Sequence, residues 1–209
     1  MRPQHITFTM AAADADGICA SQKPTEAGNL TIAGDLATGG VATLDVPRHV
    51  SITSASDESG DTFTITGTDR YGNALTEEIT GPNATTVKGT KNFKTVTTVA
   101  TDGAATGNIT VGSADEADSQ LFVTDVYGGA ITYGVDLSSG ADMTTEVKYT
   151  LDSIWSSSFS QETANYIADL GANVSDYEGS TDKPITGIRL EITGFTSGTA
   201  YFHLIQSSK

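Results

Sequence analysis

Apolar and polar residues alternate along much of this chain with the period of two that is typical of β-strands. The pattern is clearest over residues 61–80, where Phe63 and Ile65 alternate with threonines. An Asp-Arg-Tyr-Gly-Asn run follows at 69–73, and then a second alternating stretch. Turn residues between two alternating stretches predict a β-hairpin.

The same alternation predicts further strands on both sides of this hairpin. Strands are expected near 4–10, 29–33, 41–45, 93–101, 108–111 and 143–151, with another beginning at Val50 and a turn at Gly39-Gly40. Two more hairpins are expected, one pairing 121–126 with 130–137 across Gly128-Gly129 and one pairing 185–192 with 199–205. Residues 160–170 fit either a short helix capped by Ser160 and stopped at Gly171, or a loop with a strand.

These elements predict an all-β protein with at most one short helix. A length of 209 residues suffices for two β-sandwiches of about 100 residues each, Ig-like or jelly-roll-like and arranged in tandem. The acidic, small-residue run near 112–119 has the composition of a linker. The expected division is an N-terminal strand and arm at 1–28, a first sandwich at 29–113, an acidic linker at 114–119 and a second sandwich at 120–209.

Composition supports the β prediction and narrows the function. Only 37% of residues are hydrophobic, below the usual share of about 45–50%, and threonines fill many strand positions. A net charge of −15 repels phosphate and disfavours nucleic-acid binding. The densest basic cluster, Lys88, Lys91 and Lys94, is interpreted as a solvated strand edge protected against pairing.

Targeting signals do not change this picture. The first residues lack the apolar core of a signal peptide, and no run approaches the length of a membrane span. We therefore expect a protein that is made in a cytoplasm, stays soluble there and makes no membrane contact.

The residues that most often carry chemistry are scattered. Cys19 is the single cysteine, so no disulfide framework exists, and we expect a small buried or loop thiol. His5, His49 and His203 each fall on a predicted strand, without a Gly-x-Ser-x-Gly elbow or a zinc-binding spacing. The prediction is no catalytic residue, no cofactor and no metal.

Acidic clusters offer the nearest alternative to that prediction. Asp14-Ala-Asp16-Gly17 begins like a calcium loop but has Thr25 where an EF-hand needs glutamate. Two further clusters, Asp57-Glu58 with Asp61 and Asp115-Glu116 with Asp118, are weak calcium candidates. Solvated turns are the preferred interpretation of the first run.

Trp155 is the only tryptophan and lies in a serine-rich stretch, Ser153 to Ser160. We interpret it as an anchor of a core or of a subunit contact rather than as a platform for sugar rings. Glycoside hydrolysis would need two carboxylates in a cleft, usually beside such platforms, and the aromatic residues here are few.

Several stretches of the chain resemble small structural proteins of tailed bacteriophages. The resemblance rests on Gly28–Thr31, Gly39–Asp45, Val50–Ser54, Thr64–Asp69 with Gly72-Asn73, Glu77–Pro82, Thr90–Val96, Val147–Asp152, and Pro184–Leu190 through Thr196–Thr199 to Gln206. Residues 153–182 depart from the pattern. Families of this kind carry no catalytic residues.

The resemblance implies a non-enzymatic virion structural protein. The first expectation is a capsid decoration or cement protein that binds the major capsid protein or other virion proteins, as a homo-oligomer and most naturally a trimer. The first alternative is a head–tail or tail-fibre attachment protein. A carbohydrate-binding module is the second alternative.

Overall fold

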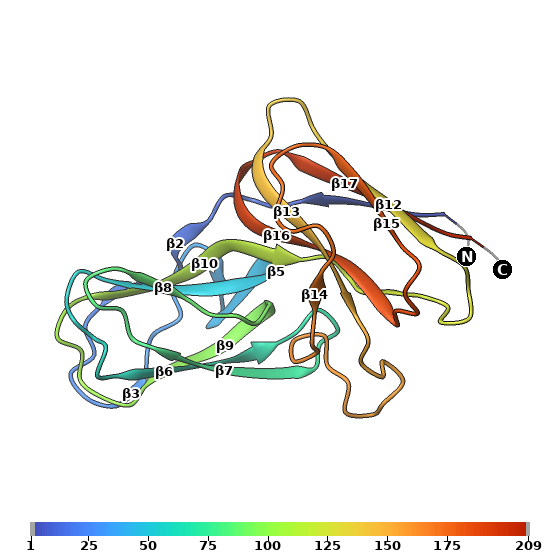
Figure 1. The fold of residues 1–209 in the computed structure, drawn as a ribbon. Helices are drawn as coiled ribbons and strands as arrows, with labels where there is room; N and C mark the ends of the chain where they lie inside the picture. Colours follow the sequence, from blue (N-terminus) through green and yellow to red (C-terminus); the bar gives the residue numbers. More distant parts are fainter. Residues whose placement is uncertain (1–2, 208–209) are drawn as a thin grey trace. The chain divides into compact units, whose positions relative to one another are not determined.

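The computed structural model describes residues 3–207, and these residues form antiparallel β-sheets and connecting loops with no helix (Figure 1). This part of the chain therefore has no helix that is long and apolar enough to cross a membrane. The predicted all-β, sandwich-like class is confirmed. Two compact units are present: a central unit of residues 13–117, and a terminal unit that joins residues up to Ala12 with residues from Asp118 onward.

The central unit contains nine strands. They are β2 (Asp14–Gln22), β3 (Gly28–Asn29), β4 (Ala37–Thr38), β5 (Val41–Ser54), β6 (Thr62–Thr68), β7 (Ala74–Thr80), β8 (Thr86–Lys88), β9 (Phe93–Thr101) and β10 (Ile109–Asp118). Their apolar side chains meet in one core, which includes Leu44, Ile52, Phe63, Val99 and Ile109.

Strand β5 serves two groups of strands because its pairing changes along its length. Its first part pairs with β4 and β9, and its last residues pair with β8 and β10. Pro47 lies between the two parts, where the register with β9 shifts between Thr43 and Arg48. Proline cannot donate to a ladder, so a bulge is the place where a strand tolerates it.

The predicted hairpin at 61–80 is confirmed. Strands β6 and β7 pair from Thr62 opposite Thr80 to Thr68 opposite Ala74. In the turn, the Asp69 carboxylate accepts hydrogen bonds from the backbone N–H of Tyr71 at 2.8 Å and of Asn73 at 2.9 Å. Gly72 takes a φ of +83°, a conformation that glycine adopts without strain.

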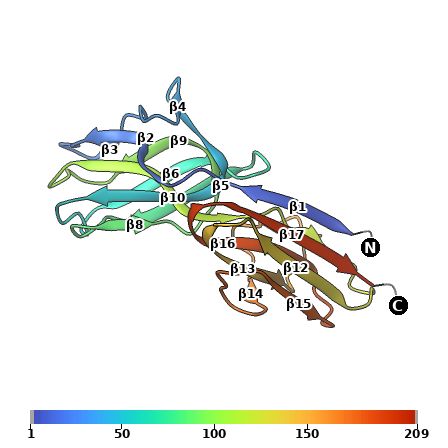
Figure 2. The same ribbon diagram turned by 90° about the horizontal axis from the view of Figure 1, so that it is seen from above.

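The terminal unit is built from two sheets. One has the order β1 (Gln4–Thr9), β17 (Thr199–Gln206), β12 (Ile131–Leu137) and β15 (Tyr177–Thr181). The other contains β14 (Ile167–Ala168), β13 (Asp142–Thr150), β16 (Gly187–Ser197) and β11 (Phe122–Val123). Figure 2 shows β1 lying along β17, so the first strand of the chain borders the last.

Aromatic contacts join the two sheets of the terminal unit. The Phe122 ring of β11 meets the edge of the Phe202 ring of β17, with centroids 5.8 Å apart. Within the four-stranded sheet, the Tyr133 ring of β12 lies 6.3 Å from the same Phe202 ring, measured between centroids. The inward residues of β13 and β16, such as Val147 and Leu190, are fully buried as well, as a sandwich core requires.

Two predicted hairpins are wrong, because in each case the strands before and after the glycine turn belong to different sheets. Strand β11 pairs with β16 and not with β12, while β12 pairs with β15 and β17. Likewise β16 pairs with β11 and β13, whereas β17 pairs with β1 and β12. The glycine turns therefore carry the chain from one sheet to the other. Gly198 has a φ of +110°, and an added Cβ would lie 2.5 Å from that of Ala141.

Two segments that were expected to be irregular contain strands, and at 160–170 one of the two predicted alternatives forms. The arm expected within 1–28 contains strand β2, whose bulged pairing with β10 hides its alternation from the sequence. Residues 114–118 of the expected linker continue β10, whose register with β5 shifts between Ser113 and Ala117. At 160–170, a single turn at Ser160 gives way to β14, so the loop with a strand is the alternative that forms.

Candidate functional site

Segment 151–174 follows β13 and has an unusual distribution of side chains. Five of its large apolar side chains are exposed: Leu151, Trp155, Ile167, Leu170 and Val174. Nine such side chains are exposed in the whole of residues 3–207, so more than half belong to this short segment. Trp155 and Val174 are the most open, at 66% and 72% exposure.

The most deeply buried side chain of segment 151–174 is polar. Gln161 is the single buried residue of the segment, with 7% exposure. The Gln161 amide donates to the backbone oxygen of Ser119 at 2.9 Å and accepts from the N–H of Leu121 at 3.3 Å. In a surface loop, the polar side chains normally face the water and the apolar side chains are normally the buried ones.

Further polar contacts hold segment 151–174 against the terminal unit. Asp169 accepts a hydrogen bond from the Tyr133 hydroxyl at 2.5 Å, and burial together with this bond raises the pKa of Tyr133. Asn173 and Thr145 exchange two backbone hydrogen bonds of 2.8 Å. The segment is therefore fixed by defined anchors rather than by its apolar side chains.

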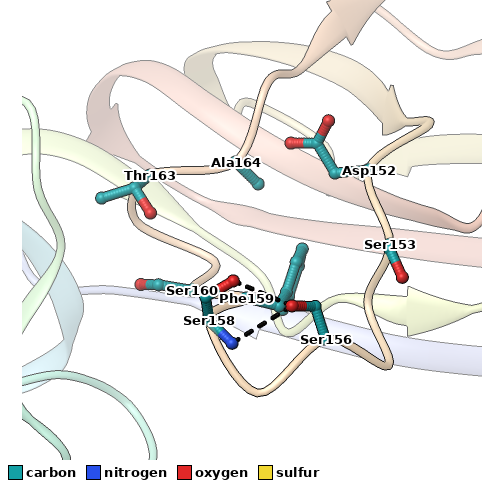
Figure 3. A pocket seen from close by; sticks show the side chains of 8 residues that line it. All are labelled: Asp152, Ser153, Ser156, Ser158, Phe159, Ser160, Thr163 and Ala164. Carbon is teal, nitrogen blue, oxygen red and sulfur yellow. Dashed lines mark hydrogen bonds between the residues drawn. The ribbon is translucent and has the colours of Figure 1, made fainter.

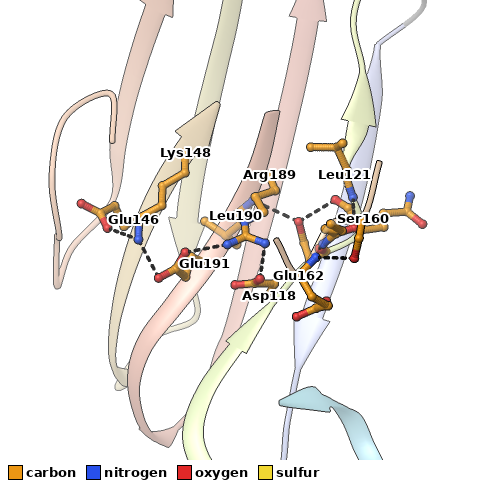
Figure 4. A network of polar contacts seen from close by, with 12 residues as sticks. Asp118, Leu121, Glu146, Lys148, Ser160, Glu162, Arg189, Leu190 and Glu191 are labelled. Carbon is orange, nitrogen blue, oxygen red and sulfur yellow. Dashed lines mark hydrogen bonds and ion pairs between the residues drawn. The ribbon is translucent and has the colours of Figure 1, made fainter. Parts of the chain in front are cut away.

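A network of charges lies beneath the segment (Figure 4). Arg189 of β16 pairs with Asp118 and with Glu191, and Lys148 of β13 pairs with Glu191 and Glu146. The side chains of Arg189 and Asp118 are almost wholly buried.

One residue of the segment reaches this network directly. The Tyr166 ring covers the Arg189 guanidinium, with the ring centroid 3.6 Å from Cζ. Stacking on a desolvated guanidinium stabilises this arrangement, so the network also fixes the position of the segment.

A hollow of about 290 Å³ opens within the segment (Figure 3). Its lining consists of Asp152, Ser153, Ser156, Ser158, Phe159, Ser160, Thr163 and Ala164. Asp152 accepts a hydrogen bond from the Asn165 N–H at 2.7 Å, which closes the loop. Apart from the Asp152 carboxylate, the eight lining residues contribute hydroxyl groups and small or aromatic side chains, with no histidine, lysine or cysteine.

Trp155 is excluded from the core by its exposure. Of the two roles expected for this residue, the core anchor is therefore wrong, and the subunit contact stays a prediction. Sequence reasoning also missed Gln161, Tyr166 and Arg189, whose roles depend on contacts between distant parts of the chain.

The remaining candidates have structural partners. Cys19 is fully buried, and this burial raises the pKa of its thiol to about 12. Such a thiol does not act as a nucleophile at neutral pH. His5 and His203 lie side by side, with ring centroids 4.6 Å apart, while His49 lies on β5 of the central unit.

The carboxylates of the acidic clusters stabilise turns and neighbouring loops. Glu58 is buried and accepts from the Ser54 hydroxyl and from the N–H groups of Thr106 and Gly107. Hydrogen bonds from Ser59 lower the pKa of Asp57. Within residues 3–207, no three His, Cys, Asp or Glu side chains are arranged to hold a metal ion.

In the first acidic run, Asp14 accepts from the N–H of Asp16 at 3.3 Å. In the third, Asp115 and Glu116 both pair with Lys88. The carboxylates of Asp14, Asp115 and Glu116 therefore each have a protein partner.

The lysine cluster makes local contacts too. Lys91 donates to the backbone oxygen of Thr76 on β7 at 2.6 Å, and Lys94 donates to that of Leu44 at 2.6 Å. Lys91 thus occupies an acceptor of the outer strand β7, which discourages pairing with another chain.

Comparison with known proteins gives no further guidance. No protein-family model matches this chain, and no curated protein matches it.

Proposed function

We propose that this chain is a non-enzymatic structural protein of a tailed-bacteriophage virion. Its role would be that of a capsid decoration protein, which binds the major capsid protein through segment 151–174. The proposal combines the resemblance of the sequence with one observation, the exposed apolar side chains on a segment that is anchored by polar contacts.

Large apolar side chains that face water are costly to the folded protein. Several large apolar side chains exposed on one segment favour a contact site, because their burial is favourable by about 25 cal/mol per Å². The polar anchors hold the segment in place before any partner binds, so little ordering entropy is lost on binding. This is the arrangement expected of a surface that waits for a partner.

Charge narrows the type of partner. Segment 151–174 carries Asp152, Glu162 and Asp169 and no lysine or arginine. Like charges placed opposite one another weaken an interface. The proposed partner surface is therefore apolar at its centre, with a neutral or basic rim.

Binding of many copies would stabilise a shell by mass action, since the decoration protein binds the assembled state. The homo-oligomer in this proposal is a trimer, which matches the threefold positions of a capsid. A head–tail or tail-fibre attachment protein would use the same surface at a lower copy number. Decoration requires on the order of hundreds of copies per particle, and a tail part about six to eighteen.

The test uses particles assembled without this chain. Purified wild-type protein is added, and the bound copies per shell protein and the temperature of particle disruption are measured. We expect saturable binding and a higher disruption temperature. A Trp155→Ser variant should bind at least tenfold more weakly, whereas Tyr127→Ser, which replaces another exposed aromatic residue outside the segment, should bind normally.

Two results would overturn the proposal. One is the absence of this chain from particles that contain their full complement of shell protein. The other is equal binding by the Trp155→Ser and wild-type proteins.

A further inference from the structure

The solvent-facing side of the four-stranded sheet in the terminal unit contains a second hollow, of about 450 Å³. Gly134, Asp136, Asp176, Tyr177, Glu178 and His203 line it. The proposed capsid contact does not involve these residues.

The hollow exists because a glycine stands at the centre of this face. Gly134 of β12 lies opposite His203 of β17 on one side and opposite Glu178 of β15 on the other. A Cβ added at Gly134 would meet no atom within 4 Å. Two strand spacings separate His203 from Glu178, which leaves a gap of about 9–10 Å above the glycine.

Neither packing nor turn geometry explains this glycine. Gly134 lies inside a regular strand, with continuous pairing on both sides and no positive φ. Glycine weakens a strand, and inside one it often marks the close approach of a ligand or of another backbone. The open space above Gly134 points to such an approach from solvent.

The groups around the hollow are mainly hydrogen-bond acceptors. The Glu178 carboxylate has no hydrogen-bond or ion-pair partner within residues 3–207. The Asp176 carboxylate accepts one bond, from the N–H of Leu137 at 2.7 Å, and keeps further acceptor capacity. Asp136 is paired with His203, at 3.2 Å between Oδ2 and Nε2. A ligand for this site must therefore donate several hydrogen bonds.

Aromatic rings continue the same face beyond the hollow. His203, His5 and Tyr201 lie in a row, with His5 4.6 Å from His203 and 6.3 Å from Tyr201 between centroids. His5 and Tyr201 are nearly parallel, at 12°. The face thus offers flat rings beside carboxylates.

We propose that this hollow binds a saccharide, with one sugar ring seated over Gly134 and its hydroxyls donating to Glu178 and Asp176. An adjoining sugar of the same glycan would lie against the row of rings.

The ring that borders the hollow favours a neutral sugar over an organic cation. Histidine is a weaker partner for cations than tryptophan, tyrosine or phenylalanine, and the ring bordering the hollow is that of His203. The proposed saccharide binding does not depend on any contact with the capsid.

The test is an NMR titration of the isolated, isotope-labelled chain. The probes are the methyl glycosides of glucose, galactose and mannose, N-acetylglucosamine, and a separate arm with arginine and spermidine. We expect at least one sugar to shift the backbone amides of residues 132–136, 176–178 and 203–205 in a saturable way.

Variants then locate the site. Gly134→Val places side-chain atoms in the hollow, where an added Cβ meets no atom within 4 Å, and should abolish the shifts, while Thr132→Val, on the same strand and face, should keep them. Glu178→Gln should weaken binding at least about tenfold, the loss expected for a hydrogen bond to a charged group.

Three outcomes would overturn the proposal. They are no shift with any sugar, shifts with arginine or spermidine alone, and sugar shifts that persist in Gly134→Val. Because the titration contains no particle, none of these outcomes bears on capsid binding.

Discussion

The β6–β7 hairpin and segment 151–174 distribute their side chains in opposite ways. In the hairpin, Phe63, Ile65 and Ile79 face the core, and threonines alternate with them on the outer side. In segment 151–174 the buried residue is Gln161, and five large apolar side chains are exposed to solvent. The hairpin is stabilised by burial within its own unit, whereas the segment has apolar surface left for a partner.

The contrast predicts that the two regions respond differently to loss of an aromatic side chain. Phe63→Ala should lower the free energy of unfolding by about 3–5 kcal/mol, because it leaves a cavity at a fully buried position. Thr64→Ala, one residue away on the outer face, should cost under about 1 kcal/mol. Urea denaturation of both variants measures the difference, and equal losses would contradict the packing described for β6.

The next largest effect on the free energy of unfolding is expected in the charge network around Arg189. Asp118→Asn leaves the buried Arg189 guanidinium with Glu191 as its remaining charged partner. Breaking a buried pair is costly, and we expect a loss of about 3 kcal/mol. Glu146→Gln, at the end of the network, should cost about 1 kcal/mol or less, since Lys148 keeps its pair with Glu191. Denaturation curves in which both variants behave alike would show that Asp118 is not the key partner.

Gln161 tests how segment 151–174 is anchored. Gln161→Ala removes the partners of the Ser119 oxygen and the Leu121 N–H, and should cost about 1–3 kcal/mol. Hydrogen exchange should become faster across 151–170 and stay unchanged in the β6–β7 hairpin. Thr163→Ala serves as an exposed control in the same loop, and faster exchange in that variant alone would refute the anchoring role.

Trp155 should contribute almost nothing to the stability of the isolated chain. Trp155→Ser is expected to change the free energy of unfolding by no more than about 0.5 kcal/mol, because its ring is largely in water. Thermal unfolding of the two proteins side by side measures this. A large destabilisation would mean that the ring packs within the protein and is not held ready for a partner.

The smallest effect is expected at Asp61, just before β6. Partial burial, and next the Asp102 carboxylate, raise the pKa of Asp61. A carboxyl group with a raised pKa in the folded state binds protons more tightly there, so its ionised form destabilises the fold at neutral pH. Asp61→Asn should therefore stabilise slightly, by no more than about 0.5 kcal/mol, and this gain should disappear as the pH falls through the pKa of Asp61. A gain that persists at low pH would contradict this cause.

Structural features that depend on residues close together in the chain can be predicted from the sequence. The sheet that a strand joins cannot, because it depends on distant residues. The hairpin at 61–80 is visible because alternation and turn chemistry are both local. The glycine turns before β12 and β17 look the same in sequence, yet they connect strands of different sheets. Bulges in the pairing of β2 with β10 likewise obscure the strand at 14–22.

The orientation of the side chains in segment 151–174 could not be predicted from the sequence either. Trp155 and the serines around it stand out in the sequence, but nothing local indicates whether the ring faces inward or outward. That orientation follows from Gln161, Asp169 and Tyr166, whose partners lie far away in the chain.

The most direct test of the central claim is the fluorescence of Trp155, because it is the only tryptophan in the chain. Replacing it with 5-hydroxytryptophan allows excitation apart from the tryptophans of other proteins. The labelled chain is then titrated with particles assembled without it. Our account predicts that the label becomes protected from acrylamide quenching as the chain binds. Binding with unchanged quenching would show that segment 151–174 stays in water, and would contradict the account.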